Sequence, residues 1–216
     1  MTEGWKARAR SKFVPLARWL AKRGVKPDQL TYLGLCLSLL AALLLGRGDF
    51  LAAAFLIGLA GLCDVLDGDV ARETGRVSAF GGFLDSTLDR VGEASLYAGL
   101  ANYYYTRAQG GALWLQNEFR AEARWGDANG YTLAILALST LILSFLVSYT
   151  RARAEALGLE CRVGWFERPE RMVVLIVAAA FGVGPVMPGA LLLLTVLSFA
   201  TAIQRVVYVW ESTRRP

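Results

Sequence analysis

The chain has no histidine among its 216 residues, and it has only three cysteines. Without histidine, both imidazole acid–base catalysis and a His-ligated zinc site are excluded. An odd number of cysteines provides no disulfide framework, and Cys36 and Cys63 lie in apolar runs, where packing is their expected role. Internal repeats and low-complexity tails are missing as well. These absences exclude histidine chemistry and a disulfide-stabilised scaffold.

Hydrophobic residues, in contrast, make up 55% of the chain, and the mean hydropathy is +0.41. This composition is typical of a polytopic membrane protein and not of one or two soluble domains. Six apolar stretches predict an all-α membrane protein with six transmembrane helices, because about 20 residues cross a hydrocarbon core of roughly 30 Å. The stretches are 30–45, 51–72, 78–104, 131–149, a short one at 171–183, and 191–210, with a polar loop at 105–128.

The N-terminal segment is basic and amphipathic. Within residues 5–23, apolar side chains recur at helical spacing on one face, and basic side chains occupy the other. We therefore expect residues 1–26 to form an interfacial helix on an anionic leaflet, and residues 27–216 to form the six-helix domain. The apolar stripe consists of Phe13, Leu16, Ala17, Leu20 and Ala21, and the basic face of Lys12, Arg18 and Lys22.

The distribution of lysine and arginine predicts the orientation. Eight of these residues precede residue 27 and five lie between 151 and 171, whereas the side without the termini holds four in total. The positive-inside rule then predicts an integral protein of the cell membrane, with both termini and the active site cytoplasmic. No nucleic-acid partner is expected, and self-association into a homodimer is left open.

Four aspartates interrupt the second and third apolar stretches. Each carboxylate costs roughly 2.5–3.5 kcal/mol near a bilayer centre, so four cost on the order of 10 kcal/mol unless they are compensated. Arg72 and Arg90 could form two acid–base pairs, but two arginines cannot neutralise four aspartates. A metal ion is the simplest remaining compensation. The four residues are Asp64, Asp67, Asp85 and Asp89.

The spacing of these aspartates favours a metal site. The first two are three residues apart and the last two are four apart, so each pair shares a helical face. A short turn around Gly75 would bring the two helices together. An all-oxygen cluster suits Mg²⁺ or Mn²⁺. Gly68, Gly81 and Ala71 keep the neighbouring backbone bare, which leaves room for a bulky ligand.

The pattern Asp64-x2-Asp67-Gly68-x2-Ala71-Arg72-x8-Gly81-x3-Asp85-x3-Asp89 resembles the signature of the CDP-alcohol phosphotransferase family at all eight positions. The six-span layout is also similar to that of the family. The resemblance implies that the four aspartates hold two divalent ions, and that Asp89 also serves as the catalytic base. It further implies that Gly68, Ala71, Arg72 and Gly81 line the CDP site.

Arginines gather in the segment 151–171 and at the end of the last apolar stretch. Pro169 and Glu170 indicate a helix start, which Arg168 and Arg171 flank, and a helix N-terminus with guanidinium groups binds phosphate well. Arg205 lies in an apolar helix and needs an anion. Alternatively, the arginines anchor the helices under the positive-inside rule, with Glu155 and Glu167 as local partners. The candidate phosphate-binding set is Arg151, Arg153, Arg168, Arg171 and Arg205.

The segments Arg-Ala-Arg-Ala-Glu and Glu-Arg-Pro-Glu-Arg resemble the phosphatidylinositol-phosphate synthase branch of the family and its archaeal ether-lipid counterpart. Members of that branch join inositol 1-phosphate to a CDP-lipid and release CMP. The same chemistry with glycerol 3-phosphate as acceptor is the alternative within the family. A divalent-cation transporter is the alternative from another class, although it would need carboxylates strung across the membrane depth. Ester or ether lipid chains and the choice of metal are left open.

Overall fold

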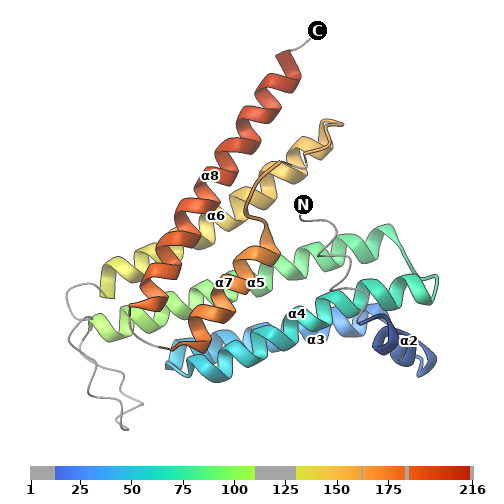
Figure 1. Cartoon of the computed structure of the whole chain (residues 1–216), viewed down its shortest axis with the longest axis horizontal. Coiled ribbons are helices and arrows are strands. Elements are labelled where there is room, and N and C mark those ends of the chain that lie inside the picture. The colour runs from blue at the N-terminus through green and yellow to red at the C-terminus, as the bar shows by residue number, and fades with distance from the viewer. Residues whose placement is uncertain (1–12, 110–129, 162, 183–184, 215–216) are drawn as a thin grey trace.

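The computed structural model describes residues 13–109, 130–161, 163–182 and 185–214, and these residues form seven helices and no strand. The connections from α2 to α5 and from α7 to α8 are short, and those from α5 to α6 and from α6 to α7 are longer. Figure 1 shows them. They are α2 (Val14–Lys22), α3 (Pro27–Arg47), α4 (Phe50–Glu73), α5 (Ala79–Ala108), α6 (Gly130–Ala156), α7 (Arg168–Ala180) and α8 (Val186–Arg214).

Four of these helices are long and apolar enough to cross a membrane: α3, α4, α6 and α8. The all-helical prediction is therefore confirmed for the described residues. The count of six spans stays a prediction, because α5 and α7 differ from the other four. Helix α5 has 30 residues but carries three acids and Arg90 in its first half, and tyrosines and Arg107 near its end. Helix α7 has 13 residues, about 20 Å of helix, which is shorter than the hydrocarbon core.

Helix α3 packs against both α4 and α5, α6 packs against α5 and α8, and α7 packs against α4 and α8 (Figure 1). The turn from α4 to α5 is tight because Gly75 adopts a left-handed conformation (φ +66°). Ser78 then caps α5 by accepting a hydrogen bond from the Gly81 N–H at 3.0 Å. This hairpin places the acid-bearing stretches of α4 and α5 next to each other, as the sequence predicts.

Small residues allow α3 and α5 to approach closely. A Cβ atom at Gly99 would lie 2.3 Å from the Ala42 carbonyl oxygen, and one at Gly92 would lie 3.2 Å from Ser38. Both glycines face α3 because they are seven residues, about two turns, apart on α5. Such contacts hold membrane helices together in the absence of a hydrophobic driving force. They also fix α3 against the helix that carries two of the aspartates.

Helix α2 covers part of the predicted amphipathic segment, of which residues 1–12 lie outside the described residues. Ala17 is buried against Leu66 and Val70 of α4, while Arg18 forms an ion pair with Glu73 at 2.8 Å. Trp19 is about half exposed. The helix is thus attached to the end of α4, close to the acid-bearing stretch. Its position on a membrane surface stays a prediction.

Candidate metal and substrate site

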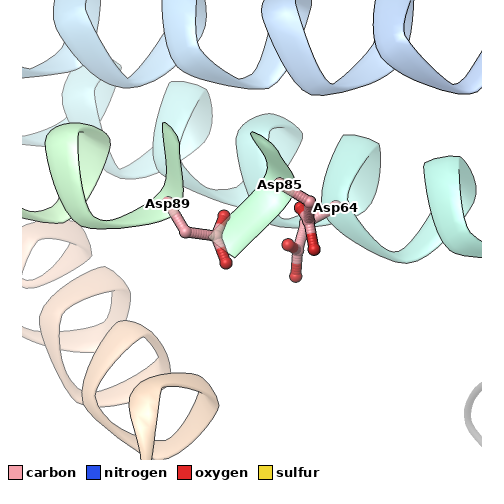
Figure 2. Close-up of side chains that lie close together, drawn as sticks. All are labelled: Asp64, Asp85 and Asp89. Carbon is pink, nitrogen blue, oxygen red and sulfur yellow. The ribbon is translucent and has the colours of Figure 1, made fainter. Parts of the chain in front are cut away.

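Three of the four predicted aspartates meet between α4 and α5. Asp64 of α4 and Asp85 and Asp89 of α5 each offer one carboxylate oxygen, and these three oxygens all lie within 4.8 Å of one another. Figure 2 shows the three carboxylates on the same side of the two helices. The i, i+4 spacing of Asp85 and Asp89 and the hairpin at Gly75 produce this arrangement.

Asp67, the fourth aspartate, lies one turn along α4 and is 6% exposed. Its Oδ2 accepts a hydrogen bond from the Thr31 hydroxyl of α3 at 2.8 Å. Asp67 is not part of the tight three-residue group, but it lines the same cavity. The wall of this cavity comes from α3, α4, α5 and the first residue of α7. Its lining is Leu30, Thr31, Gly34, Leu35, Ser38, Ala60, Asp64, Asp67, Asp85, Leu88, Asp89, Gly92 and Arg168.

The donor set of this cluster fits a hard divalent cation. Every donor is an oxygen, and carboxylates are the ligands that Mg²⁺ and Mn²⁺ prefer. Three oxygens within 4.8 Å of one another can share an ion at ordinary metal–oxygen distances. The half-buried position of all three raises the cost of leaving their charges uncompensated.

Of the two arginines that the pairing alternative requires, Arg90 lies beside the cluster and Arg72 does not. Arg168 lies 3.1 Å from Asp64 and 2.6 Å from Asp89, although it is far away in sequence. Arg90 approaches Asp89 at 3.6 Å and also donates to Ser148 of α6. Arg72 pairs instead with Asp69, which is outside the cluster. The aspartates still outnumber Arg90 and Arg168, so part of their negative charge is left for a metal ion to neutralise.

Arg171 of α7 and Glu93 of α5 form a fully buried ion pair. The Arg171 Nε and second terminal nitrogen donate to the two carboxylate oxygens of Glu93 at 2.6 and 3.0 Å. The side chains are 0% and 1% exposed. Arg171, which was predicted to bind the acceptor phosphate, is therefore not accessible to a phosphate in this conformation.

The five predicted arginines do not converge on one pocket. Arg205 donates to the carbonyl oxygens of Val163 and Val147 and to Glu167 at 3.2 Å. Arg151 contacts Glu155 at 2.9 Å and Glu167 at 3.4 Å. The local acid partners of the alternative interpretation are therefore present.

Arg153 is exposed on α6. Of the five arginines, only Arg168 lines the aspartate cavity.

The residues predicted to line the CDP site surround the α4–α5 turn. Gly68, Ala71 and Gly81 are partly buried, and Arg72 is exposed at the end of α4. The predicted CDP site would therefore extend from the aspartates toward the hairpin. Sequence reasoning missed Thr31, because a hydroxyl near the start of an apolar helix gives no signal until a carboxylate is seen beside it.

An oxygen-ligand cluster between two helices of a membrane protein fits an enzyme that acts on lipid substrates with the help of metal ions. The family model for CDP-alcohol phosphatidyltransferase matches residues 25–210, and the chain is a member of that family and an integral membrane protein. The enzyme interpretation is therefore confirmed over the cation transporter.

The relatives of the chain cover most of its length. It is 38% identical to a phosphatidylinositol phosphate synthase of Streptomyces avermitilis, over 90% of this chain and 76% of that protein. An archaetidylinositol phosphate synthase of Methanothermobacter thermautotrophicus is 35% identical, over 85% of this chain and 83% of that one. The crystal structure of the phosphatidylinositol phosphate synthase of Mycobacterium tuberculosis with CDP-DAG bound superposes with a TM-score of 0.74 at 33% identity, covering 91% of this chain and 92% of that one. The same enzyme has been solved with manganese and citrate.

Proposed function

We propose that this protein transfers the phosphatidyl-type group of a CDP-lipid, diacyl or diether, to inositol 1-phosphate and releases CMP. The observation that carries the proposal is the meeting of Asp64, Asp85 and Asp89 beside Arg168, in the family's own sequence pattern. The relatives named phosphatidylinositol phosphate synthase and archaetidylinositol phosphate synthase support the choice of acceptor.

The four aspartates would hold two divalent ions, Mg²⁺ or Mn²⁺. When bound, the ions would neutralise charge on the pyrophosphate and on the departing CMP. Asp64, Asp85 and Asp89 would supply the oxygens that lie closest together, and Asp67 would contribute from one turn along α4. The manganese-containing structure of the Mycobacterium tuberculosis enzyme supports this assignment.

Asp89 would act as the general base. An inositol hydroxyl oxygen attacks the phosphorus that carries the lipid, the bond from that phosphorus to the CMP oxygen breaks, and the hydroxyl proton passes to Asp89. Arg168 lies 2.6 Å from Asp89, so it keeps a positive charge beside the place where phosphate oxygens must arrive. Gly68, Ala71, Arg72 and Gly81 would hold the CDP group along the hairpin.

Five arginines would attract the acceptor phosphate by their positive charge, and each would have its own role. They are Arg151, Arg153, Arg168, Arg171 and Arg205. Arg168 would contact the phosphate, because it is the member of this set that lines the cavity. Arg171 and Arg205 are buried and would act by holding α7 and the preceding segment in place. Arg151 and Arg153 face solvent and would add to the attraction.

In the membrane, we propose six spans with α2 on the cytoplasmic surface and the site on the cytoplasmic side. The segments expected on that side lie close together: α2 contacts Glu73, the start of α7 contacts Asp64, and Tyr208 near the end of α8 donates to Glu160. Helices α5 and α7 would be the other two spans, and each buries one face and exposes the other, as Leu96 and Val91 do on α5 and Leu175 and Val173 on α7. A homodimer is compatible with this layout.

The test is the release of CMP from CDP-diacylglycerol by the purified protein with Mg²⁺ or Mn²⁺. We compare inositol 1-phosphate, free inositol and glycerol 3-phosphate as acceptors. A preference for inositol 1-phosphate supports the proposal. A preference for glycerol 3-phosphate would refute the acceptor and keep the reaction type, and no CMP release with any acceptor would refute the reaction.

A further inference from the structure

Helix α3 carries none of the signature aspartates, yet it reaches the site through one hydroxyl. Thr31 Oγ1 donates to Asp67 Oδ2 at 2.8 Å. The same oxygen lies 3.3 Å from the Pro27 carbonyl one turn earlier, so the shorter contact to Asp67 takes precedence. Thr31 is partly buried and lines the same cavity as the four aspartates.

This contact is made to the aspartate that most needs an external partner. The other three signature carboxylates gather within 4.8 Å, on two helices joined by a tight hairpin. Asp67 is 6% exposed, so little bulk solvent reaches its side chain. A carboxylate has two oxygens, and a hydroxyl that occupies one of them limits the rotation of the group and leaves the other for the cavity.

Thr31 is itself held rigidly relative to the cluster. Helix α3 packs against α5 through the close contacts of Gly92 with Ser38 and of Gly99 with Ala42. The hydroxyl therefore has a fixed position with respect to Asp85 and Asp89, which lie on the same helix as the two glycines. A rotation of Asp67 away from the cavity would break the contact.

We infer that Thr31 is a positioning residue that holds Asp67 in the orientation required for binding the divalent ion. The inference rests on the proposed metal site. Residues that hydrogen-bond to a metal ligand orient it, and their loss costs about 10–100-fold in metal affinity. In this role Thr31 acts on the ion through Asp67 and not on the reacting atoms.

The experiment measures Mn²⁺ binding to the full-length protein in detergent by electron paramagnetic resonance, without any CDP-lipid. Thr31→Val removes the hydroxyl and keeps the shape, and we expect it to weaken Mn²⁺ binding by about 10–100-fold. Thr31→Ser restores the hydroxyl and should stay within about threefold of wild type. Thr140→Val is the matched control, because the Thr140 hydroxyl contacts Thr195 on α8, away from the cavity.

Kinetics provide a second measurement. In CMP release, Thr31→Val should raise the Mn²⁺ concentration needed for half-maximal activity, while kcat at saturating Mn²⁺ stays close to wild type. Mn²⁺ should also raise the unfolding temperature of wild type and of Thr140→Val more than that of Thr31→Val. A purely structural role would lower the unfolding temperature without changing the response to Mn²⁺.

The outcomes separate this inference from the metal site on which it rests. Wild-type affinity for Mn²⁺ in Thr31→Val, or an equal loss in Thr31→Ser, would refute the role of the hydroxyl and leave the metal site standing. No Mn²⁺ binding by wild type would refute the metal site and this inference with it. If Thr31→Val does not fold, Thr31→Ala replaces it, because alanine removes the hydroxyl without adding bulk.

Discussion

The buried pair of Glu93 and Arg171 offers a quantitative test of how α7 is fixed beside the aspartates. Two hydrogen bonds, at 2.6 and 3.0 Å, join side chains that are at most 1% exposed. Removing one partner leaves the other charge buried, which costs about 3–5 kcal/mol. That is a large part of the roughly 5–15 kcal/mol by which a protein is stable.

The perturbation is a double-mutant cycle with apolar replacements. Glu93→Leu and Arg171→Met should each lower the free energy of unfolding by about 3–5 kcal/mol. The double variant leaves no buried charge from the pair. Its free energy of unfolding should therefore lie within about 1–2 kcal/mol of the wild-type value, and not be lower by the sum of the two single losses. The free energies are measured by denaturant titration in detergent micelles, followed by tryptophan fluorescence. Losses that add up across the cycle, or single losses below about 1 kcal/mol, would refute the buried pair.

The double variant also tests the role of Arg171 in function. If Arg171 acts by holding α7, a folded double variant should keep most of its affinity for inositol 1-phosphate. The acceptor KM is the quantity to compare, with the KM for CDP-lipid as the internal control. If a stable double variant has lost affinity for the acceptor, this result would indicate that Arg171 contacts the phosphate directly.

The remaining predictions concern the ions, the base and the acceptor. EDTA should abolish CMP release and Mg²⁺ or Mn²⁺ should restore it, whereas undiminished activity in EDTA would rule the metal site out. Asp89→Asn should reduce kcat severely and leave CDP-lipid binding largely intact. Asp67→Asn should weaken metal binding and CDP-lipid binding together. Equal losses of CDP-lipid affinity in the two variants would refute the role of Asp89 as base. Arg168→Ala removes a charge-assisted contact worth about 1.5–3 kcal/mol, so the acceptor KM should rise about 10–100-fold. The CDP-lipid KM should hardly change in that variant, and the opposite pattern would assign Arg168 to the other substrate.

Local sequence rules predicted the hairpin and its acids correctly. The spacing of Asp85 and Asp89, the turn at Gly75 and the apolar stretches depend on helical periodicity and on backbone preferences within a few residues. The same rules indicated the start of α7 at Arg168, from Pro169 and Glu170. They were less informative about the number of spans, because α5 and α7 are too polar or too short to be judged without their neighbours.

Contacts between distant segments account for the errors. The sequence offered Arg72 and Arg90 as nearby bases, but Arg72 pairs with Asp69, and Arg168, 104 residues from Asp64, joins Arg90 beside the aspartates. The apolar sequence around Arg205 indicated that this residue needs a phosphate. In the structure Arg205 donates instead to Glu167 and to two backbone carbonyl oxygens on other segments. The hydroxyl of Thr31 reaches Asp67 across 36 residues.

The sequence by itself determined which chemical groups this protein can use and on which helical faces they lie. Four carboxylates without histidine or matching bases, at spacings of three and four, specify an oxygen-ligand site in a membrane helix pair because periodicity is a local property. Only the tertiary structure decided which base meets which acid. Glu93 and Arg171 are 78 residues apart, and their pairing depends on how α7 packs beside α5. Ion pairs between separate helices form according to helix packing, which no short stretch of the chain encodes.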